Sequence, residues 1–265
     1  MPHSTYIHGT SPSEQERLAA LNRANNPHFL EFLDVRGASA ILEVGSGLGV
    51  LAAEVARSAP SARVVGLEYS AEQLARVPRG DGAPGNLSFQ QGDAHALPFA
   101  DGAFDVVYCR FVLEHVTDPG RVLREMHRVL VPGGRAFVQE NNILINDFDP
   151  DCPAFARVWR AFAALQSRLG GDALVGKRLY RLLTGAGFSH TRLSIQPEVH
   201  HSGQPAFEPW VRNLIGNVRS GEAALVKHGL ATQEEINGSI AELEALIRRD
   251  DATALFYWNR AVGSR

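Results

Sequence analysis

The residues of this sequence with the clearest chemical spacing are three glycines and an acid that follow two apolar runs. Gly45, Gly47 and Gly49 come directly after the run 41–44, and Glu68 ends the next run, 63–67. Glycine has no side chain and tolerates positive φ, so such a turn lets the backbone approach a ligand closely. A carboxylate at the end of the second run can accept two hydrogen bonds from the hydroxyls of a ribose. The spacing therefore predicts a ligand that contains a ribose.

NAD is one such ligand, and two details of the sequence argue against it. The dinucleotide fingerprint requires glycine or alanine at its sixth position, where this sequence has Val50. A further acid, Asp93, follows the third apolar run, where a carboxylate suits the amino group of an adenine. The segment 97–99, Leu-Pro-Phe, offers apolar side chains to hold the ring. These features favour an adenosine that is not part of NAD.

The elements that must position these residues alternate between strand and helix. Apolar or β-branched runs predict strands over 40–44, 63–67, 87–90, 104–109 and 135–139, with helices after the glycine turn and over 71–77 and 119–130. This alternation predicts an α/β fold with a parallel sheet that is covered on both faces. Ligands bind such sheets outside the carboxyl ends of the strands, where the glycine turn and both acids are expected.

The second half of the chain is predicted to be mostly helical. Helices are expected over 154–169, 176–186 and 207–249, and strands over 190–199 and 254–262. A capping box at 11–14 predicts a further helix near the N-terminus. We therefore divide the chain into an N-terminal helical lid (1–36), an α/β domain (37–206 and 251–265) and a helical cap insertion (207–250).

The composition is that of a globular protein and excludes several classes. Of the 265 residues, 45% are hydrophobic and 21% charged, and the net charge of −3 offers no positive field for nucleic acid. No run approaches the roughly 18 apolar residues of a membrane span, and no signal peptide is recognisable, so we expect a cytoplasmic protein without a membrane partner. Cys109 and Cys152 lack zinc spacing, so no metal is expected. The sequence is compatible with a homo-oligomer.

Taken together, the motifs of the first 140 residues resemble those of a known family in both order and spacing. The family is that of the class I S-adenosylmethionine-dependent methyltransferases of small-molecule type. The resemblance implies a Rossmann-like, seven-stranded, mostly parallel sheet whose last strand, 254–262, is antiparallel, and it implies S-adenosylmethionine as cofactor. The segments that carry it are ILEVGSGLG (41–49), VVGLEYS (64–70), QGDAHALPF (91–99), FDVVYCRFVLEHVTD (104–118) and VLVPGGRAFV (129–138).

The resemblance also implies which residues contact the cofactor. Most of them lie at the ends of the predicted strands, and one lies in the N-terminal segment 6–18. They are Gly45 and Gly47 at the amino-acid part, Arg110 near its carboxylate, Glu68 at the ribose hydroxyls, Tyr69 and Gln73 beside the adenosine, Asp93 and the backbone of Ala94 at the adenine, and Tyr6 as a lid.

Methyl transfer from a sulfonium depends mainly on alignment, so an acid or base need not be essential. An oxygen or nitrogen acceptor still loses a proton, and His115, after the fourth strand, is either the base or a structural histidine. Asn141 and Asn142 follow the fifth strand and either contact the acceptor or form a turn. His200 follows the sixth strand and either lines the acceptor pocket or is exposed.

These features predict transfer of a methyl group to oxygen, nitrogen or carbon of a small apolar or aromatic acceptor held beneath the helical insertion, in specialised metabolism. An enclosed site suits a metabolite better than a polymer. Three alternatives stay open: a protein or peptide methyltransferase, a protein of the same fold that binds the cofactor without transferring methyl groups, and a nicotinamide-dependent oxidoreductase.

Overall fold

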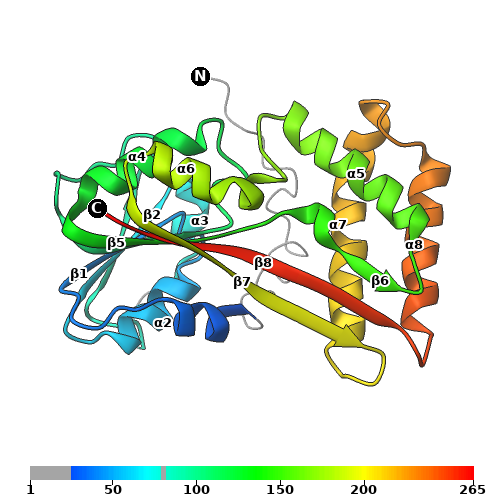
Figure 1. Cartoon of the computed structure of the whole chain (residues 1–265), viewed down its shortest axis with the longest axis horizontal. Coiled ribbons are helices and arrows are strands. Elements are labelled where there is room, and N and C mark those ends of the chain that lie inside the picture. Colours follow the sequence, from blue (N-terminus) through cyan, green and yellow to red (C-terminus); the bar gives the residue numbers. More distant parts are fainter. Residues whose placement is uncertain (1–24, 79–81) are drawn as a thin grey trace.

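The computed structural model describes residues 25–78 and 82–265, and within them eight strands form one sheet. The strand order is β3-β2-β1-β4-β5-β8-β6, and β7 pairs with β8 (Figure 1). Strands β1 to β5 pair in parallel, whereas β8 is antiparallel to β5, β6 and β7. The strands are β1 (Ala40–Val44), β2 (Arg63–Glu68), β3 (Leu87–Gln91), β4 (Phe104–Arg110), β5 (Leu130–Glu140), β6 (Asp147–Asp149), β7 (Ser189–His201) and β8 (Thr253–Ser264).

The predicted fold class is confirmed, with one strand more than expected. The additional strand is the short β6, whose acidic residues are typical of a solvated loop. In the structure, Asp147 and Asp149 are exposed while Phe148, between them, is buried against Phe155 and Trp210. This alternation has the period of two that a half-buried strand requires.

The helices begin and end at residues that satisfy their free backbone groups. The Asp118 side chain accepts a hydrogen bond from the Arg121 amide at the start of α4, and Thr232 and Glu235 form a capping box at α8. The helical stretch predicted over 207–249 is two helices, since a turn with Gly229 at φ +62° ends the first. The helices are α2 (Val50–Ser58), α3 (Ala71–Ala75), α4 (Pro119–Val129), α5 (Pro153–Arg168), α6 (Leu179–Gly185), α7 (Phe207–Lys227) and α8 (Gln233–Ile247), with short 3-10 turns η1 (Ile143–Ile145) and η2 (Val175–Arg178).

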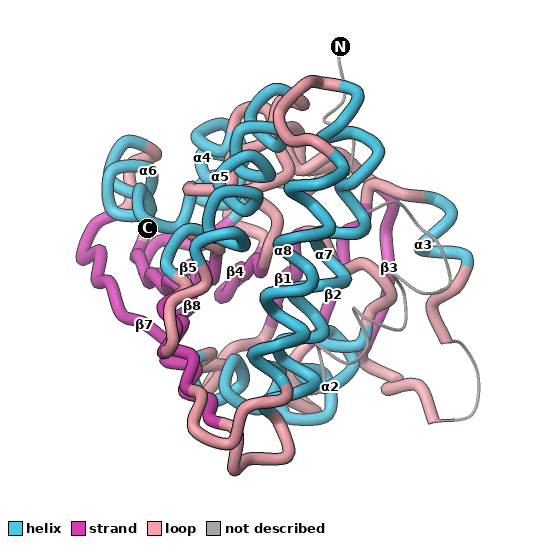
Figure 2. The backbone as a smooth tube through the Cα atoms, turned by 90° about the vertical axis from the view of Figure 1, so that its right-hand side faces the viewer, coloured by secondary structure: helices cyan, strands magenta, loops and turns pink. Residues whose placement is uncertain are grey.

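Apolar side chains gather in three clusters. One lies between the sheet and helices α4 and α6, and a second lies on the opposite face beneath α2. The third joins α5, α7 and α8 to β6 and the start of β8 at one end of the sheet, where Figures 1 and 2 show the three helices together. Helix α5 thus shares a core with the predicted cap of residues 207–250, although α6 and β7 lie between them in the sequence. The predicted domain boundaries themselves stay a prediction.

None of the helices within residues 25–78 and 82–265 combines the length and the apolar character needed to cross a membrane.

Candidate functional site

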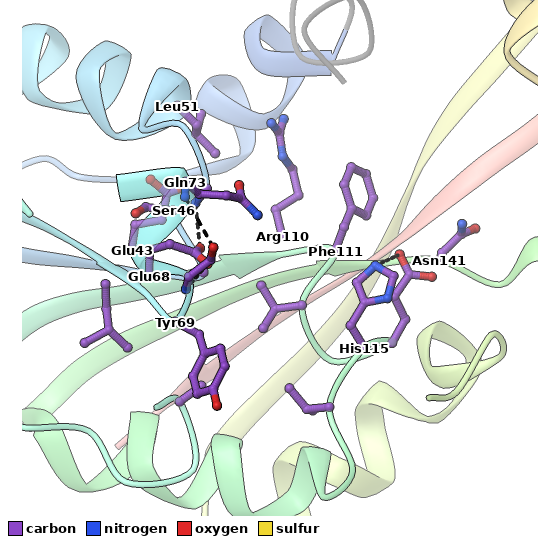
Figure 3. Close-up of a pocket in the computed structure, with 18 of the residues that line it drawn as sticks. Glu43, Ser46, Leu51, Glu68, Tyr69, Gln73, Arg110, Phe111, His115 and Asn141 are labelled. Carbon is purple, nitrogen blue, oxygen red and sulfur yellow. Dashed lines mark hydrogen bonds and ion pairs between the residues drawn. The ribbon is translucent and has the colours of Figure 1, made fainter. Parts of the chain in front are cut away.

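A cavity of about 780 Å³ opens at the carboxyl ends of the parallel strands and extends to α5 and α7. Its volume is in the upper part of the range of roughly 300–1,000 Å³ that is usual for small-molecule sites. Figure 3 shows side chains from several strand ends turned toward it. The predicted site residues that line it are Gly45, Gly47, Glu68, Tyr69, Gln73, Asp93, Ala94, Arg110, His115 and Asn141.

The glycine turn brings the backbone to the cavity wall. Gly45 has φ +76°, and a Cβ built there would lie 2.5 Å from Cγ2 of Val112. The amides of Gly45 and Ser46 both donate to the carbonyl oxygen of Leu67, at 2.8 and 2.9 Å. Position 45 therefore requires glycine both for its conformation and for its space.

Glu68 holds the glycine turn and the next loop together. Its Oε2 accepts a hydrogen bond from the Gly47 amide and its Oε1 accepts one from the Ser70 amide, both at 2.9 Å. The residue is buried, and each carboxylate oxygen keeps a second lone pair. Glu68 can therefore still accept hydrogen bonds from ribose hydroxyls. The Ser70 hydroxyl caps α3 by accepting from the Gln73 amide, which fixes Gln73 at the wall (Figure 3).

Asp93 is held by the histidine two positions along the chain. Its Oδ1 accepts a hydrogen bond from the His95 amide and contacts His95 Nδ1, both at 2.8 Å. Partial burial raises the pKa of Asp93, but the bonds from His95 outweigh it and the net change is a decrease. Asp93 therefore presents an ionised acceptor beside Ala94, as contact with an adenine amino group requires.

Glu43, at the end of β1, is a site residue that the sequence analysis missed. It lies inside the buried strand, and this burial raises its pKa to about 8, against the opposing charge of Arg110. Glu43 Oε2 and the Ser46 hydroxyl are both buried at the cavity without a close hydrogen-bond partner among the described residues, and the Tyr108 hydroxyl beside Glu43 lowers the pKa of that carboxyl only in part. These orphaned atoms fit a ligand that carries an ammonium group. The available signal was an acid in an otherwise apolar strand, one residue from its end.

Arg110 lies at the cavity between two aromatic rings. Its Nη2 donates to Asn26 Oδ1 at 2.7 Å, and the guanidinium stands 5.5 Å from the ring centroids of Phe29 and Phe111. Burial lowers the pKa of Arg110, and the negative charge of Glu43 opposes that shift. Arg110 therefore offers a positive charge at the same end of the cavity as the Glu43 carboxyl, which becomes an anion when it loses its proton. Together they match the carboxylate and the ammonium of an amino acid.

Phe111 follows β4 in a backbone conformation that is rare for its residue type. Its φ is +57°, and its amide donates to the Gln139 carbonyl at 3.0 Å. Residues held in this region cluster at functional sites, because the surrounding structure must fix them. The conformation sets the Phe111 ring 4.6 Å from that of Trp258 in β8, and both rings line the cavity.

His115 is carried by a turn that Glu140 holds in place. Glu140 Oε1 accepts hydrogen bonds from the amides of Val112 and Leu113, at 2.9 and 2.8 Å. His115 Nε2 lies 3.6 Å from Oε1 of the buried Glu114 (Figure 3). Burial, and then the charge of Glu114, raise the pKa of Glu140 to about 8. The turn therefore presents one titratable ring, His115, to the cavity.

Two of the predicted site residues that the structure describes are not brought to this cavity. Asn142 instead caps η1, its side chain accepting from the Leu144 amide at 3.4 Å. His200 is neither exposed nor at the cavity: it is buried, stacked on Trp210 at 4.9 Å, with Nε2 3.3 Å from Glu198. The alternation of β7 turns its ring toward α7, so the expected acceptor contacts of Asn142 and His200 are corrected. Tyr6 lies outside the described residues.

Comparison with known proteins finds one matching family model, described as "Methyltransferase domain", over residues 42–138. Methyltransferase GfsG of Streptomyces halstedii is 37% identical over 139 residues, which are 51% of this chain and 49% of that protein. Demethylmenaquinone methyltransferase of Thermus thermophilus is 43% identical over 101 residues, 38% of this chain and 46% of that protein. The chain thus spans about half the length of the curated relatives that it matches.

Solved structures share the whole fold at low identity. Phosphoethanolamine N-methyltransferase 2 of Haemonchus contortus, in complex with phosphomonomethylethanolamine and S-adenosylhomocysteine, aligns with a TM-score of 0.54 at 18% identity. The alignment covers 95% of this chain and 53% of that one. The YcgJ protein of Bacillus subtilis aligns with a TM-score of 0.60 at 17% identity, over 92% and 98% of the two chains. These likenesses establish the fold.

Proposed function

We propose that this chain, which belongs to the class I S-adenosylmethionine-dependent methyltransferases, transfers a methyl group from S-adenosylmethionine to a small-molecule acceptor. The observation that carries the proposal is the continuity of one cavity. The predicted cofactor residues at the strand ends line one part of this cavity, and η1, α5 and α7 form the walls of the other part. A cofactor and an acceptor that lie in one cavity can meet without crossing solvent.

The residues at the strand ends fit the parts of this cofactor. Glu68 would accept from the ribose hydroxyls, and Asp93 with Ala94 would meet the adenine, with Tyr69 and Gln73 beside the nucleoside. The orphaned Oε2 of Glu43 would take the ammonium of the amino-acid part, and the neighbouring Arg110 its carboxylate. When bound there, the cofactor supplies a methyl group that is activated by its sulfonium.

The contribution of the chain to the reaction is mainly alignment. The bond from the acceptor atom to the methyl carbon forms as the carbon–sulfur bond breaks, and the electron pair of that bond stays on sulfur. Holding the reacting atoms in line can lower a barrier by several kcal/mol, up to about 7–11 kcal/mol in the best cases. Phe111 and Trp258, in ring contact between the two ends of the cavity, would exclude water from this line.

His115 would accept the proton that a hydroxyl or amine acceptor loses. It lines the cavity, and its side chain is 26% exposed, so a proton can leave it for solvent. Glu114, 3.6 Å away, would orient the ring and stabilise the imidazolium.

We place the acceptor among small molecules of specialised metabolism. The helices α5 and α7 that wall the chamber support a small molecule, because a polymer needs an open groove. A methyltransferase of Streptomyces halstedii is among the relatives, at 37% identity over about half of each chain. Methylation of a protein or peptide and a non-catalytic role for the bound cofactor are the competing functions.

Incubation with S-adenosylmethionine and a panel of metabolites tests the proposal. We expect time-dependent S-adenosylhomocysteine together with a product heavier by one CH2 unit. Label that appears in polypeptide instead would favour protein methylation. Saturable cofactor binding with no S-adenosylhomocysteine across the panel would favour a non-catalytic role. Calorimetric binding of NAD but not of S-adenosylmethionine would overturn the assignment altogether.

A further inference from the structure

We infer that the helix-walled end of the cavity takes an uncharged, planar, oxygenated acceptor, and that Asn217 forms a hydrogen bond with an oxygen of that acceptor. We call this end the acceptor chamber and define it by Trp159, Phe162, Gln166, Asn213 and Asn217. The inference rests on the proposed function, since it assigns the acceptor class of the same cavity.

The first step is the aromatic wall. Trp159 and Phe162 are stacked, with ring centroids 5.1 Å apart and planes 22° apart, on one face of α5. The Trp159 indole nitrogen donates to the Ile143 carbonyl, which fixes the ring and satisfies its polar atom. A Cβ at Gly221 of α7 would lie 2.6 Å from the Phe162 ring, so the ring and α7 are in close contact. Both rings also line the cavity, and an aromatic molecule packs favourably against aromatic side chains in offset or edge-to-face arrangements.

The second step is the charge of the chamber. The cavity residues contributed by η1, α5 and α7 are aliphatic, aromatic or amide, and none is acidic or basic. Glu114 and His115 line the same cavity, and their side chains pair with each other, with His115 Nε2 3.6 Å from Glu114 Oε1. An ionic acceptor would lose its hydration in the chamber without gaining a counter-charge from the helices. The chamber therefore favours an uncharged molecule.

The polar side chains of the chamber are amides. Asn213 and Asn217 lie four residues apart on α7 and both reach the cavity, so they share one helix face. Gln166 is already engaged, because its Nε2 donates to the Glu114 carbonyl at 3.1 Å. Among the described residues, the Asn217 side chain makes no hydrogen bond, and Asn141 Oδ1 is buried without a partner. The side chains of Asn217 and Asn141 are therefore the amides with which a bound ligand would form hydrogen bonds.

The competing use of aromatic rings is a cage for an ammonium group. Such a cage places ring faces around the cation. Here Trp159 and Phe162 are nearly parallel and continue a stack with Phe155, 5.2 Å from Trp159. In this stack the rings pack against one another instead of surrounding a common space, so they do not form a cage for a cation.

The test uses the full chain saturated with S-adenosylhomocysteine and three probes that share one ring system. They are 2-naphthol, 2-naphthoate and 2-naphthylmethylammonium, titrated calorimetrically at pH 7. We expect 2-naphthol to bind at least about tenfold more tightly than either ion, because only the ions lose charge hydration. Tighter binding of the ammonium probe would establish the cage instead. Tighter binding of the anion, or no binding of 2-naphthol, would also overturn the inference.

A matched pair of variants tests Asn217 itself. Asn217→Leu should weaken the binding of 2-naphthol by about tenfold and change the affinity for naphthalene by less than about twofold. Only 2-naphthol has an oxygen that can form a hydrogen bond with Asn217. Asn237→Leu, at an exposed site on α8, is the control and should change neither. Equal losses for both probes would indicate a purely structural Asn217, and no loss would exclude its contact with the oxygen.

Binding of S-adenosylhomocysteine alone separates this inference from the proposed function. If the chain binds S-adenosylhomocysteine but the probes behave otherwise than expected, only the acceptor class is wrong. If the chain does not bind S-adenosylhomocysteine, the proposed function itself fails.

Discussion

The two ends of the cavity are built by different means. At the strand ends, the carboxylates Glu68 and Asp93 are fixed by hydrogen bonds from backbone amides, two residues away in sequence for Ser70 and His95 and in the glycine turn for Gly47. At the acceptor chamber, neutral side chains project from α5 and α7, which are far apart in sequence and meet in a common core. The first end is specified by local motifs and suits one invariant ligand. The second depends on helix packing and can vary without disturbing the sheet.

His115 stands between the two ends, and its removal should have the largest effect. We expect His115→Ala to lower kcat by about 100-fold for a hydroxyl or amine acceptor, because general-base assistance is commonly of that size. Affinity for S-adenosylhomocysteine should not change. His228→Ala, at an exposed position after α7, is the matched control. An unchanged kcat in His115→Ala would show that the histidine only supports the turn.

Glu68 tests the cofactor end alone. Glu68→Ala should weaken cofactor binding by about 1 to 3 kcal/mol, because charged hydrogen bonds are lost. The preference among acceptor probes should stay the same, since Glu68 is remote from α5 and α7. Calorimetry measures the affinity, and circular dichroism checks that the loop still folds without its bonds to Gly47 and Ser70. Equal cofactor affinity in the variant and the parent protein would refute the ribose contact.

The titration of Glu43 should make cofactor binding depend on pH at the strand ends and not at the acceptor chamber. Because burial raises its pKa to about 8, this carboxyl is largely protonated in the free protein at pH 7. A cofactor ammonium favours the ionised form, so binding should release a proton and become tighter as pH rises. We expect a gain of about threefold to tenfold in S-adenosylhomocysteine affinity between pH 6 and 7.5. Glu43→Gln should show a flat profile, and a slope that survives in this variant would assign the proton elsewhere.

Glu140 has the smallest expected effect, and on stability rather than on binding. Its pKa is raised from 4.5 to about 8 in the folded protein. The stability that it contributes is therefore complete below about pH 4.5 and is lost as pH rises through 8. Glu140→Gln keeps the oxygen that accepts from Val112 and Leu113 but cannot ionise. The Tm of the variant minus the Tm of the parent chain should increase by about 2–4 °C between pH 5 and pH 8. A Tm difference that does not change with pH would contradict this.

The part of the site that could be predicted from the sequence is the part that local patterns encode. Strands β1 to β5, the glycine turn and Glu68 follow from apolar runs that end in glycine or acid. Glu43 was not predicted as a site residue, because its apolar neighbours indicate only that it belongs to a strand. Its role depends on its burial beside Arg110, which the sequence does not show. His200 was misplaced because a strand pattern does not indicate which helix covers each face. Asn217 could not be found, since its role depends on how α7 packs against α5.

The most direct test of the account is a crystal structure of the chain with S-adenosylhomocysteine. We expect the ribose hydroxyls within hydrogen-bonding distance of Glu68, with the sulfur directed past Phe111 toward the acceptor chamber. A nucleoside that lies between α5 and α7, away from Glu68, would contradict it.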